Sequence, residues 1–375
     1  MNSAEWILII ILLISVSFYS GVIRSYSSGW SRIKPIPETS EPSTFLSIIV
    51  AVRNEAENIV ALIERLQSQD YPAELFELII VNDHSTDSTV KTVMDLQAKL
   101  SISLIGLPKD RSGKKTALNY GIRHASGTLV ITTDADCRPG KNWLRTIASY
   151  YQGNEYRMLS GPVAIESPKG FLARFQSLEF ISLVSSGAGA IGSGFPTMCN
   201  GANLVYEKEA FYAVDGFQGN EQIPGGDDIF LLEKFVKNFG RNSIGFMKNT
   251  EAIVYTNPTH SLWAYLSQRF RWVAKSPAYK NPSIIFSAIV VLLLNLSLLV
   301  TIIGACFSTT LLLAFIVAFL LKCIIDLPLL WKASGFFKQR SLLWYYLLFQ
   351  AVYFIFISIS GILGHMLPYT WKGRK

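Results

Sequence analysis

The chain has 375 residues, of which 50% are hydrophobic and only 16% are charged, and its mean hydropathy is +0.31. This composition is too apolar for an ordinary soluble globule and is typical of a globular domain joined to membrane segments. The net charge of +7 is spread along the chain without the basic blocks of a nucleic-acid-binding protein, so we expect no nucleic acid partner. The four cysteines have neither zinc-ligand spacing nor the pattern of a disulfide framework, which favours a reducing face for the soluble part.

The chain begins with an almost unbroken apolar run from Trp6 to Tyr19. A cleaved signal peptide would carry positive charge before this run and small residues at a cleavage site. Here Glu5 precedes the run and Arg24 follows it. We therefore predict an uncleaved transmembrane anchor over residues 1–24, with its N-terminus outside.

Strand-like and helix-like stretches alternate over residues 44–260, which is typical of a mainly parallel sheet covered by helices. Four strands are predicted from "FLSIIVAV", "FELIIVND", "ISLIGL" and "TLVITTDAD". Asn54 is expected to cap the helix after the first strand, because Glu57 follows three residues later. The pattern predicts a Rossmann-like α/β nucleotide fold, and the absence of a GxGxxG turn argues against a dinucleotide site.

The first acidic signature, "VNDHSTDS", follows the second strand. Ligands of open α/β sheets bind beyond the carboxyl ends of the strands, so Asp83 is predicted to contact a ligand. The alternative is that Asp83, Ser85 and Asp87 form a turn and cap the next helix, and both roles can hold at once.

The second acidic signature, Asp134-Ala-Asp136, ends the fourth strand and is the strongest local signal. The two carboxylates converge only if the chain turns there, which Pro139 and Gly140 favour. Mg²⁺ and Mn²⁺ prefer oxygen ligands, such as these carboxylates together with two phosphates of a bound nucleotide. Both aspartates are therefore predicted metal ligands. A phosphatase-type nucleophile is disfavoured because "DADCRPG" lacks the usual continuation, and a plain acidic turn is the other alternative.

The third acidic signature, "GGDDIF", is similar to the GGDEF motif of cyclic dinucleotide cyclases. That motif lies on a hairpin, whereas "IFLLEKFVKNFG" predicts an amphipathic helix ended by Gly240, so we reject the cyclase interpretation. A carboxylate at a helix N-terminus has its anionic form favoured by about 0.5 kcal/mol. The alternative to chemistry is an N-capping pair, a role that Asp227 would fit.

A basic and aromatic signature, "QRFRW", lies on a predicted interfacial helix within residues 261–283. Gln268, Arg271 and Trp272 are three or four residues apart and share a helix face. Arginine can bind a diphosphate bidentately and tryptophan can stack on a sugar. A plain interfacial anchor is the alternative.

Residues 284–367 contain three further apolar segments, which we predict to be C-terminal transmembrane helices. Lys322 and Asp326 in the second segment are four residues apart, which favours an intramembrane ion pair over a contact with a substrate. Most of the basic residues near the spans fall on the side of the soluble domain, which predicts that this domain faces the cytoplasm. The basic tail Lys372–Lys375 breaks this rule if the last segment crosses, so either the tail is tolerated or one segment is re-entrant.

The three acidic signatures, in this order and followed by "QRFRW" and membrane segments, resemble the membrane-bound family 2 glycosyltransferases. This group holds cellulose, chitin and hyaluronan synthases and ceramide glucosyltransferase. The resemblance covers residues 45–272 and the layout of the flanking helices. It implies a GT-A catalytic domain in the plasma or inner membrane that moves a sugar from a nucleotide-sugar, with a UDP-sugar expected, by a metal-dependent and inverting reaction.

The resemblance also implies roles for individual residues. Asp228 matches the general base, and Lys114 or Lys115 of "SGKKTALNYGI" matches a lysine near the diphosphate, although a solvated helix start is the alternative. The remaining donor-binding residues that it implies are Glu55, Asp83, Asp134, Gln268, Arg271 and Trp272. The usual Asp-Asp pair is Asn82-Asp83 here, so the carry-over rests on Asp83. Asn200, Gly201 and Asn203 match an acceptor-side segment as candidate sugar contacts.

The acceptor remains open between a membrane lipid that receives one sugar, which we slightly prefer, and a growing polysaccharide. The complete "QRFRW" motif favours a polymer, whereas about four spans are few for a translocation channel. A third interpretation is an inert membrane scaffold, against which the intact Asp134, Asp136, Asp228 and Trp272 argue. The glycine-rich stretch 171–195 fits either an interfacial helix with a flexible lid or a plain loop.

Overall fold

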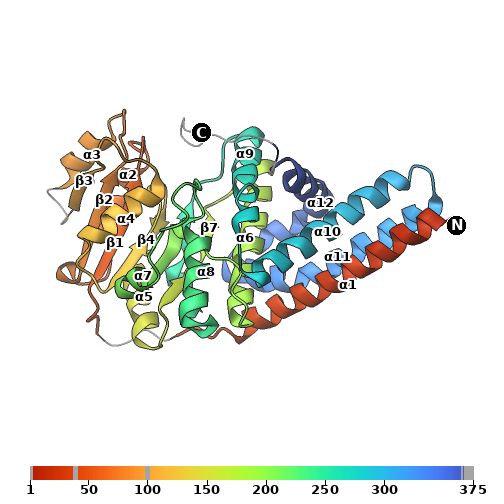
Figure 1. Ribbon diagram of the computed structural model, residues 1–375, viewed down its shortest axis with the longest axis horizontal. Helices are drawn as coiled ribbons and strands as arrows, with labels where there is room; N and C mark the ends of the chain where they lie inside the picture. Colours follow the sequence, from red (N-terminus) through yellow and green to blue (C-terminus); the bar gives the residue numbers. More distant parts are fainter. Residues whose placement is uncertain (1–2, 37–40, 98–101, 365, 367–375) are drawn as a thin grey trace. The chain divides into compact units, whose positions relative to one another are not determined.

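The computed structural model describes residues 3–36, 41–97, 102–364 and 366 (Figure 1). The chain divides into two compact units, each described by itself below. The sheet unit contains residues 33–167 and 198–258, and the helical unit contains residues 1–32, 168–197 and 259–375.

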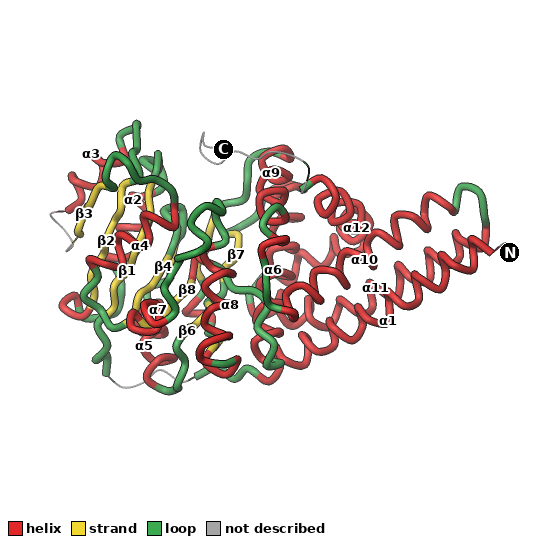
Figure 2. The backbone as a smooth tube through the Cα atoms, viewed as in Figure 1, coloured by secondary structure: helices red, strands yellow, loops and turns green. Residues whose placement is uncertain are grey.

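The sheet unit is built on a seven-stranded sheet with the order β3-β2-β1-β4-β8-β6-β9 (Figure 2). Its strands are β1 (Leu46–Val52), β2 (Phe76–Asn82), β3 (Ile102–Gly106), β4 (Leu129–Thr132), β6 (Met158–Ser160), β8 (Leu204–Glu207) and β9 (Ile244–Phe246). The four strands predicted from the sequence are confirmed and run parallel, whereas β8 is antiparallel to both β4 and β6. The carboxyl ends of β1, β2 and β4 therefore meet at one edge of the sheet.

A second sheet of three strands has the order β5-β10-β7. Its strands are β5 (Arg138–Pro139), β10 (Val254–Thr256) and β7 (Val163–Ile165). Strand β5 begins two residues after Asp136, so the end of β10 is brought beside the second acidic signature.

Amphipathic helices cover the large sheet because their apolar residues recur on one face. They are α2 (Ile59–Gln67), α3 (Thr89–Leu96), α4 (Lys114–His124), α5 (Trp143–Gln152), α7 (Lys208–Ala213) and α8 (Asp227–Phe239). Helix α4 packs on β1 and β2 at Gly121. A Cβ atom at Gly121 would lie 2.6 Å from Cγ2 of Ile49, so only glycine allows this close approach.

The expected N-cap at Asn54 is wrong. Helix α2 begins at Ile59, and Asn54 instead adopts a left-handed conformation with φ of 54°. Its Oδ1 accepts a hydrogen bond of 2.8 Å from the amide of Thr86 in the loop after β2. The two loops lie side by side at the sheet edge, and this long-range contact takes the place of the local cap.

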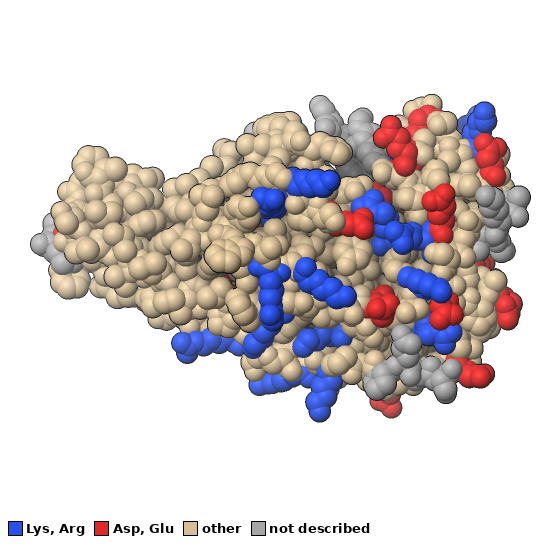
Figure 3. All heavy atoms as spheres, turned by 180° about the vertical axis from the view of Figure 1, so that it is seen from behind, with Lys and Arg blue, Asp and Glu red and all other residues tan. Residues whose placement is uncertain are grey.

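The helical unit contains α1 (Ser3–Arg32), α6 (Gly170–Gly192), α9 (Leu262–Val273), α10 (Pro282–Gly304), α11 (Thr309–Phe336) and α12 (Tyr346–Leu363). Four helical stretches among the described residues are long and apolar enough to cross a membrane: Ser3–Arg32, Pro282–Gly304, Thr309–Phe336 and Arg340–Leu363. This agrees with one N-terminal and three C-terminal predicted spans, although the first helix continues to Arg32. The large apolar side chains of these helices are widely exposed, and the face in Figure 3 is largely uncharged over the spanning helices.

The glycine-rich stretch within 171–195 is helix α6, so the alternative of a plain loop is wrong. It packs against α1 where two glycines meet. A Cβ at Gly29 would lie 2.0 Å from the carbonyl oxygen of Gly189, and a Cβ at Gly189 would lie 2.3 Å from that of Tyr26. The glycines therefore serve close helix packing.

The predicted ion pair on α11 is confirmed. Nζ of Lys322 lies 2.8 Å from Oδ2 of Asp326, and the lysine side chain is fully buried. Tyr19 of α1 donates a hydrogen bond of 2.7 Å to Asp326, and Gln350 of α12 accepts one of 2.6 Å from Lys322. The pair is thus satisfied inside the helical unit and joins three helices.

Candidate active site

The loops after β1 and β2 place two predicted donor-binding residues at the carboxyl edge of the sheet. Asp83 is buried, and its Oδ2 accepts a hydrogen bond of 3.0 Å from the amide of Gly113. Burial raises the pKa of Asp83, and this effect outweighs the Gly113 hydrogen bond and the charge of Arg53. Glu55 lies in the loop after β1, where its Oε2 accepts a hydrogen bond of 2.8 Å from Asn58.

Lys114 lies at the centre of the acidic signatures. Its Nζ donates a hydrogen bond of 2.6 Å to Oδ1 of Asp134 and lies 3.6 Å from Oδ2 of Asp227. Burial alone would lower the pKa of Lys114, but the charges of Asp134, Asp227 and Asp228 outweigh it and raise the pKa above its usual range. The second and third acidic signatures, which are more than 90 residues apart in sequence, are thus joined through one charged lysine.

Lys115 has a different environment from that of its neighbour. It is buried, and its Nζ donates hydrogen bonds to the carbonyls of Asn220 at 2.6 Å and Ile223 at 2.9 Å. The sequence left open which of the two lysines lies near the acidic signatures, and the geometry selects Lys114.

Asp136 lies deeper than Asp134. Its Oδ2 accepts a hydrogen bond of 3.0 Å from the hydroxyl of Thr256, at the end of β10. Burial, then the charge of Asp134 and more weakly that of Glu55, raise the pKa of Asp136. The charge of Asp134 therefore disfavours the ionised form of Asp136.

Asp134 and Asp136 fit a divalent ion whose other ligands come from the substrate and from water. Within the described ranges, no group of three His, Cys, Asp or Glu residues could hold a metal ion. Asp134 and Asp136 nevertheless provide two repelling carboxylates, and the Asp134 side chain is 40% exposed. Mg²⁺ and Mn²⁺ accept one or two carboxylates when phosphate oxygens and waters fill the other positions.

Asp228 is positioned by the backbone at the start of α8. Its Oδ2 accepts a hydrogen bond of 3.1 Å from the amide of Gly201, and its Oδ1 accepts one of 2.8 Å from Ile229. The N-cap is Gly226, which has no side chain to cap with, so the capping alternative for Asp227 is wrong. Asp227 is instead buried against Lys114.

The acceptor-side segment divides into two roles. A Cβ at Gly201 would lie 3.1 Å from Oδ2 of Asp227, so this position favours glycine beside the acid pair. Asn203, in contrast, is fully buried and cannot contact a sugar. Its Nδ2 donates to the carbonyls of Pro162 and Ala252, and its Oδ1 accepts from the indole of Trp143. The side-chain amide of Asn203 therefore makes its hydrogen bonds inside the core, which the sequence alone did not indicate.

The residues of "QRFRW" lie on α9 in the helical unit. Gln268, Arg271 and Trp272 were predicted from the sequence, whereas Arg269, which is buried, was not. The Arg269 guanidinium lies 4.0 Å from the centre of the Trp272 ring, and its Nη1 donates a hydrogen bond of 3.3 Å to Gln268. Arg269 therefore contacts two of the three predicted residues.

Glu179 of α6 is the counter-ion of Arg269. Its Oε1 accepts a hydrogen bond of 2.8 Å from Nε of Arg269, and Nη2 makes a second contact with Oε2. Tyr265 donates a further hydrogen bond of 2.5 Å to Glu179, and its ring stacks on Phe356 of α12. A single acid within the apolar segment "FQSLEFISL" was the available signal, since a buried carboxylate requires a partner.

Comparison with known proteins gives a consistent result. Residues 47–212 match the family model described as glycosyl transferase family 2. Glycosyltransferase AglE of Haloferax volcanii is 28% identical over 185 residues, which are 49% of this chain and 59% of that protein. Poly-beta-1,6-N-acetyl-D-glucosamine synthase of Staphylococcus epidermidis is 28% identical over 190 residues, covering 48% of this chain and 43% of the synthase. The chain thus spans roughly half the length of these curated relatives.

The fold agrees with a solved structure, that of the mannosyltransferase PcManGT from Pyrobaculum calidifontis in complex with GDP-Man and Mn²⁺. The TM-score is 0.60 with 20% sequence identity, over 93% of this chain and 99% of that one. The predicted GT-A fold with N-terminal and C-terminal apolar helices is thereby confirmed.

Proposed function

We propose that this chain, whose residues 47–212 match the family model described as glycosyl transferase family 2, moves a sugar from a nucleotide diphosphate to a membrane-associated acceptor, with inversion at the anomeric carbon. One observation carries this proposal: Lys114 joins Asp134 to Asp227, beside Asp228, at the carboxyl edge of the sheet. Ligands of open α/β sheets bind at that edge.

The donor is a nucleotide-sugar, and we infer a UDP-sugar. Asp83 and Glu55 lie at the ends of neighbouring strands, where a base and ribose would bind. Gly113 connects this region to Lys114 and the carboxylates around it, because the Gly113 amide binds Asp83 and the next residue is Lys114. Lys114 offers a point charge for the diphosphate.

Asp134 and Asp136 would hold Mg²⁺ or Mn²⁺, as proposed for the donor set above. Such an ion, when bound, neutralises charge on the departing nucleotide diphosphate. The remaining work falls to the residues of the chain. Lys114 holds Asp134 and Asp227 in place, and the Thr256 hydroxyl orients Asp136.

Asp228 acts as the general base in this proposal. Its carboxylate takes the proton of the acceptor hydroxyl as that oxygen bonds to the anomeric carbon. The bond between the anomeric carbon and the diphosphate oxygen breaks on the opposite face, and its electron pair leaves with the nucleotide diphosphate. Two backbone amides fix the carboxylate before the reaction, so little reorganisation is needed.

We propose a membrane lipid, such as a glycolipid, as the acceptor of a single sugar. The four candidate spans and the buried ion pair on α11 support this choice. That pair is satisfied by Tyr19 and Gln350 and so does not line a polar path for a glycan. The catalytic domain is proposed to face the cytoplasm.

The test uses membranes that contain the full chain and a panel of radiolabelled UDP- and GDP-sugars with Mn²⁺ or Mg²⁺. We expect label in solvent-extractable lipid that carries one sugar of inverted configuration. Label in insoluble polymer would indicate a processive synthase, and no label from any donor would favour an inert scaffold. Asp228→Asn should abolish transfer but retain nucleotide binding. Asp70→Asn, a change of the same kind in an exposed ion pair, serves as the control.

A further inference from the structure

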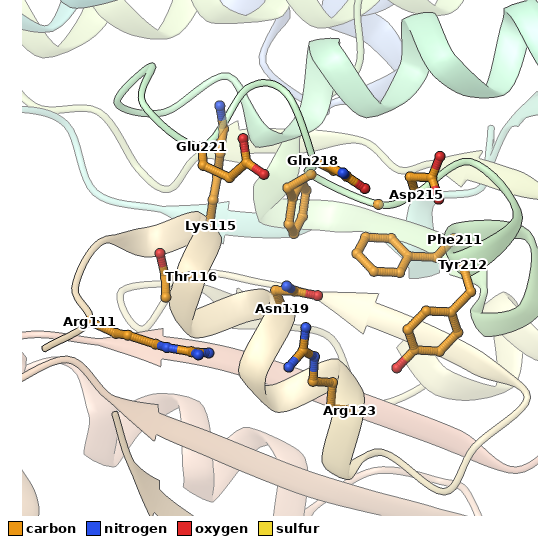
Figure 4. Close-up of a pocket in the computed structure, with 12 residues that line it drawn as sticks. Arg111, Lys115, Thr116, Asn119, Arg123, Phe211, Tyr212, Asp215, Gln218 and Glu221 are labelled. Atoms are coloured by element: carbon orange, nitrogen blue, oxygen red, sulfur yellow. The ribbon is translucent and has the colours of Figure 1, made fainter. Parts of the chain in front are cut away.

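A cavity lies in the sheet unit, away from the carboxylates of the candidate active site. It has a volume of about 490 Å³ and is open to solvent between α4, α7 and the loop that follows α7 (Figure 4). Its volume falls in the range of small-molecule sites, roughly 300–1,000 Å³. Asp134, Asp227 and Asp228 do not line it.

One wall is a cationic and polar face of α4. Thr116, Asn119 and Arg123 are three or four residues apart and therefore project from one face, and Arg111 precedes the helix. The guanidinium groups of Arg111 and Arg123 are exposed. Within the part of the chain that the structure describes, neither guanidinium has a carboxylate partner.

The opposite wall supplies groups of another kind. Tyr212 is 45% exposed and presents its ring to the cavity, as Figure 4 shows. Gln218 and the carboxylates of Asp215 and Glu221 lie on the same side. Carboxylate and amide oxygens accept hydrogen bonds from hydroxyl groups, and an aromatic face packs against the apolar face of a sugar ring.

Two lysines hold the loop that forms this wall. Lys115 binds the carbonyls of Asn220 and Ile223. Lys234 of α8 donates to the carbonyls of Gly216 at 2.7 Å and Gln218 at 2.9 Å. The wall is therefore fixed by contacts within the protein, and a ligand would not have to order it.

We propose that this cavity is a second binding site, for a phosphorylated saccharide. The two uncompensated guanidinium groups select a phosphate, which arginine binds bidentately. The amides of Asn119 and Gln218 can donate hydrogen bonds to sugar hydroxyls and accept them, and the two carboxylates accept hydrogen bonds from these hydroxyls. Tyr212 packs on the ring. A purely anionic ligand would be repelled by Asp215 and Glu221, so the carboxylates favour a molecule that carries hydroxyls as well as phosphate.

The cavity is separate from the proposed donor site, because none of the proposed donor-binding residues lines it. Lys114 contacts Asp134, whereas Lys115 binds the loop that forms the wall of the cavity. A sugar phosphate should therefore bind to protein that is already saturated with nucleotide. Binding at this site does not depend on whether the proposed transfer occurs.

The experiment measures binding by isothermal titration calorimetry on the detergent-solubilised full chain with saturating UDP and Mn²⁺. The probes are glucose 1-phosphate, inorganic phosphate and glucose. We expect glucose 1-phosphate to bind at one site per chain, phosphate to bind at least fivefold more weakly, and glucose to give no measurable heat. Absence of glucose 1-phosphate binding under these conditions, or its equal binding with glucose, would overturn the proposal.

Two variants assign the site. Arg111→Gln/Arg123→Gln should weaken glucose 1-phosphate binding at least tenfold, whereas Arg65→Gln/Lys91→Gln, which removes the same charge from exposed positions outside the cavity, should not. Asp215→Asn/Glu221→Gln should remove the preference for glucose 1-phosphate over phosphate. If Arg65→Gln/Lys91→Gln weakened binding as much as Arg111→Gln/Arg123→Gln, only net charge would matter, and the site would be rejected.

Discussion

The buried pair between Glu179 and Arg269 allows a quantitative test of how the "QRFRW" helix is held. The two side chains are 2% and 7% exposed, so their charges are almost fully removed from solvent. Glu179→Gln keeps the shape but leaves the Arg269 charge uncompensated. Breaking a buried pair in this way costs about 3–5 kcal/mol.

The surface pair between Arg145 and Asp70 provides the internal comparison. Its side chains are 24% and 51% exposed, so Asp70→Asn should cost less than about 1 kcal/mol. The double variant Glu179→Leu/Arg269→Met replaces both charges by apolar groups, and it should recover most of the stability lost by Glu179→Gln. Unfolding of the detergent-solubilised protein by heat or denaturant gives the change in the free energy of unfolding for each of the three variants.

The double variant also separates stability from function. It removes the guanidinium that stacks on Trp272 and contacts Gln268, so transfer should fall at least tenfold although the protein stays folded. The loss should appear mainly in KM for the acceptor. If Glu179→Gln were no more destabilising than Asp70→Asn, or if the folded double variant kept full activity, Arg269 would not be a positioning residue.

The remaining predictions concern the sheet unit. Because burial raises the pKa of Asp83 above its unfolded value, the ionised carboxylate opposes folding at neutral pH, and this cost is absent below the unfolded pKa. Asp83→Asn should thus raise the melting temperature at pH 7 but not at strongly acid pH, while weakening nucleotide binding in calorimetry. Lys114→Gln should lower kcat at least a hundredfold, since Asp134 and Asp227 lose their shared cation. A wild-type rate would show that transfer does not need the Lys114 charge. Chelation should stop transfer and added Mn²⁺ or Mg²⁺ should restore it, whereas Asp136→Asn should need far more metal; unchanged rates after chelation would contradict the metal role.

The sequence predicted the parallel half of the sheet well, for a physical reason. Strands buried on both faces are continuous apolar runs, and β1, β2 and β4 are almost entirely buried. The membrane segments were predicted for the same reason, because length and hydropathy suffice. The positions of Asp83 and Asp134 followed from strand ends alone.

Features that depend on long-range contacts were not predictable in this way. Asn54 binds the neighbouring loop rather than its own helix, and Asn203 is consumed by Trp143 and two carbonyls. Arg269 was not predicted as a functional residue, because its partner Glu179 is 90 residues away. In each case the local pattern was compatible with two environments, and only the tertiary structure distinguished them.

Adjacent lysines on α4 show how one local motif serves two purposes. Neighbouring residues of a helix project about 100° apart, so Lys114 and Lys115 face different sides. Lys114 contacts Asp227 directly, whereas Lys115 binds the loop whose last residues lead into α8, the helix that begins with Asp227 and Asp228. Both ammonium groups therefore act on the same acid pair, one through charge and the other through the backbone. The charge of Lys114 therefore acts on the acids themselves, while the hydrogen bonds of Lys115 hold the loop that leads to them.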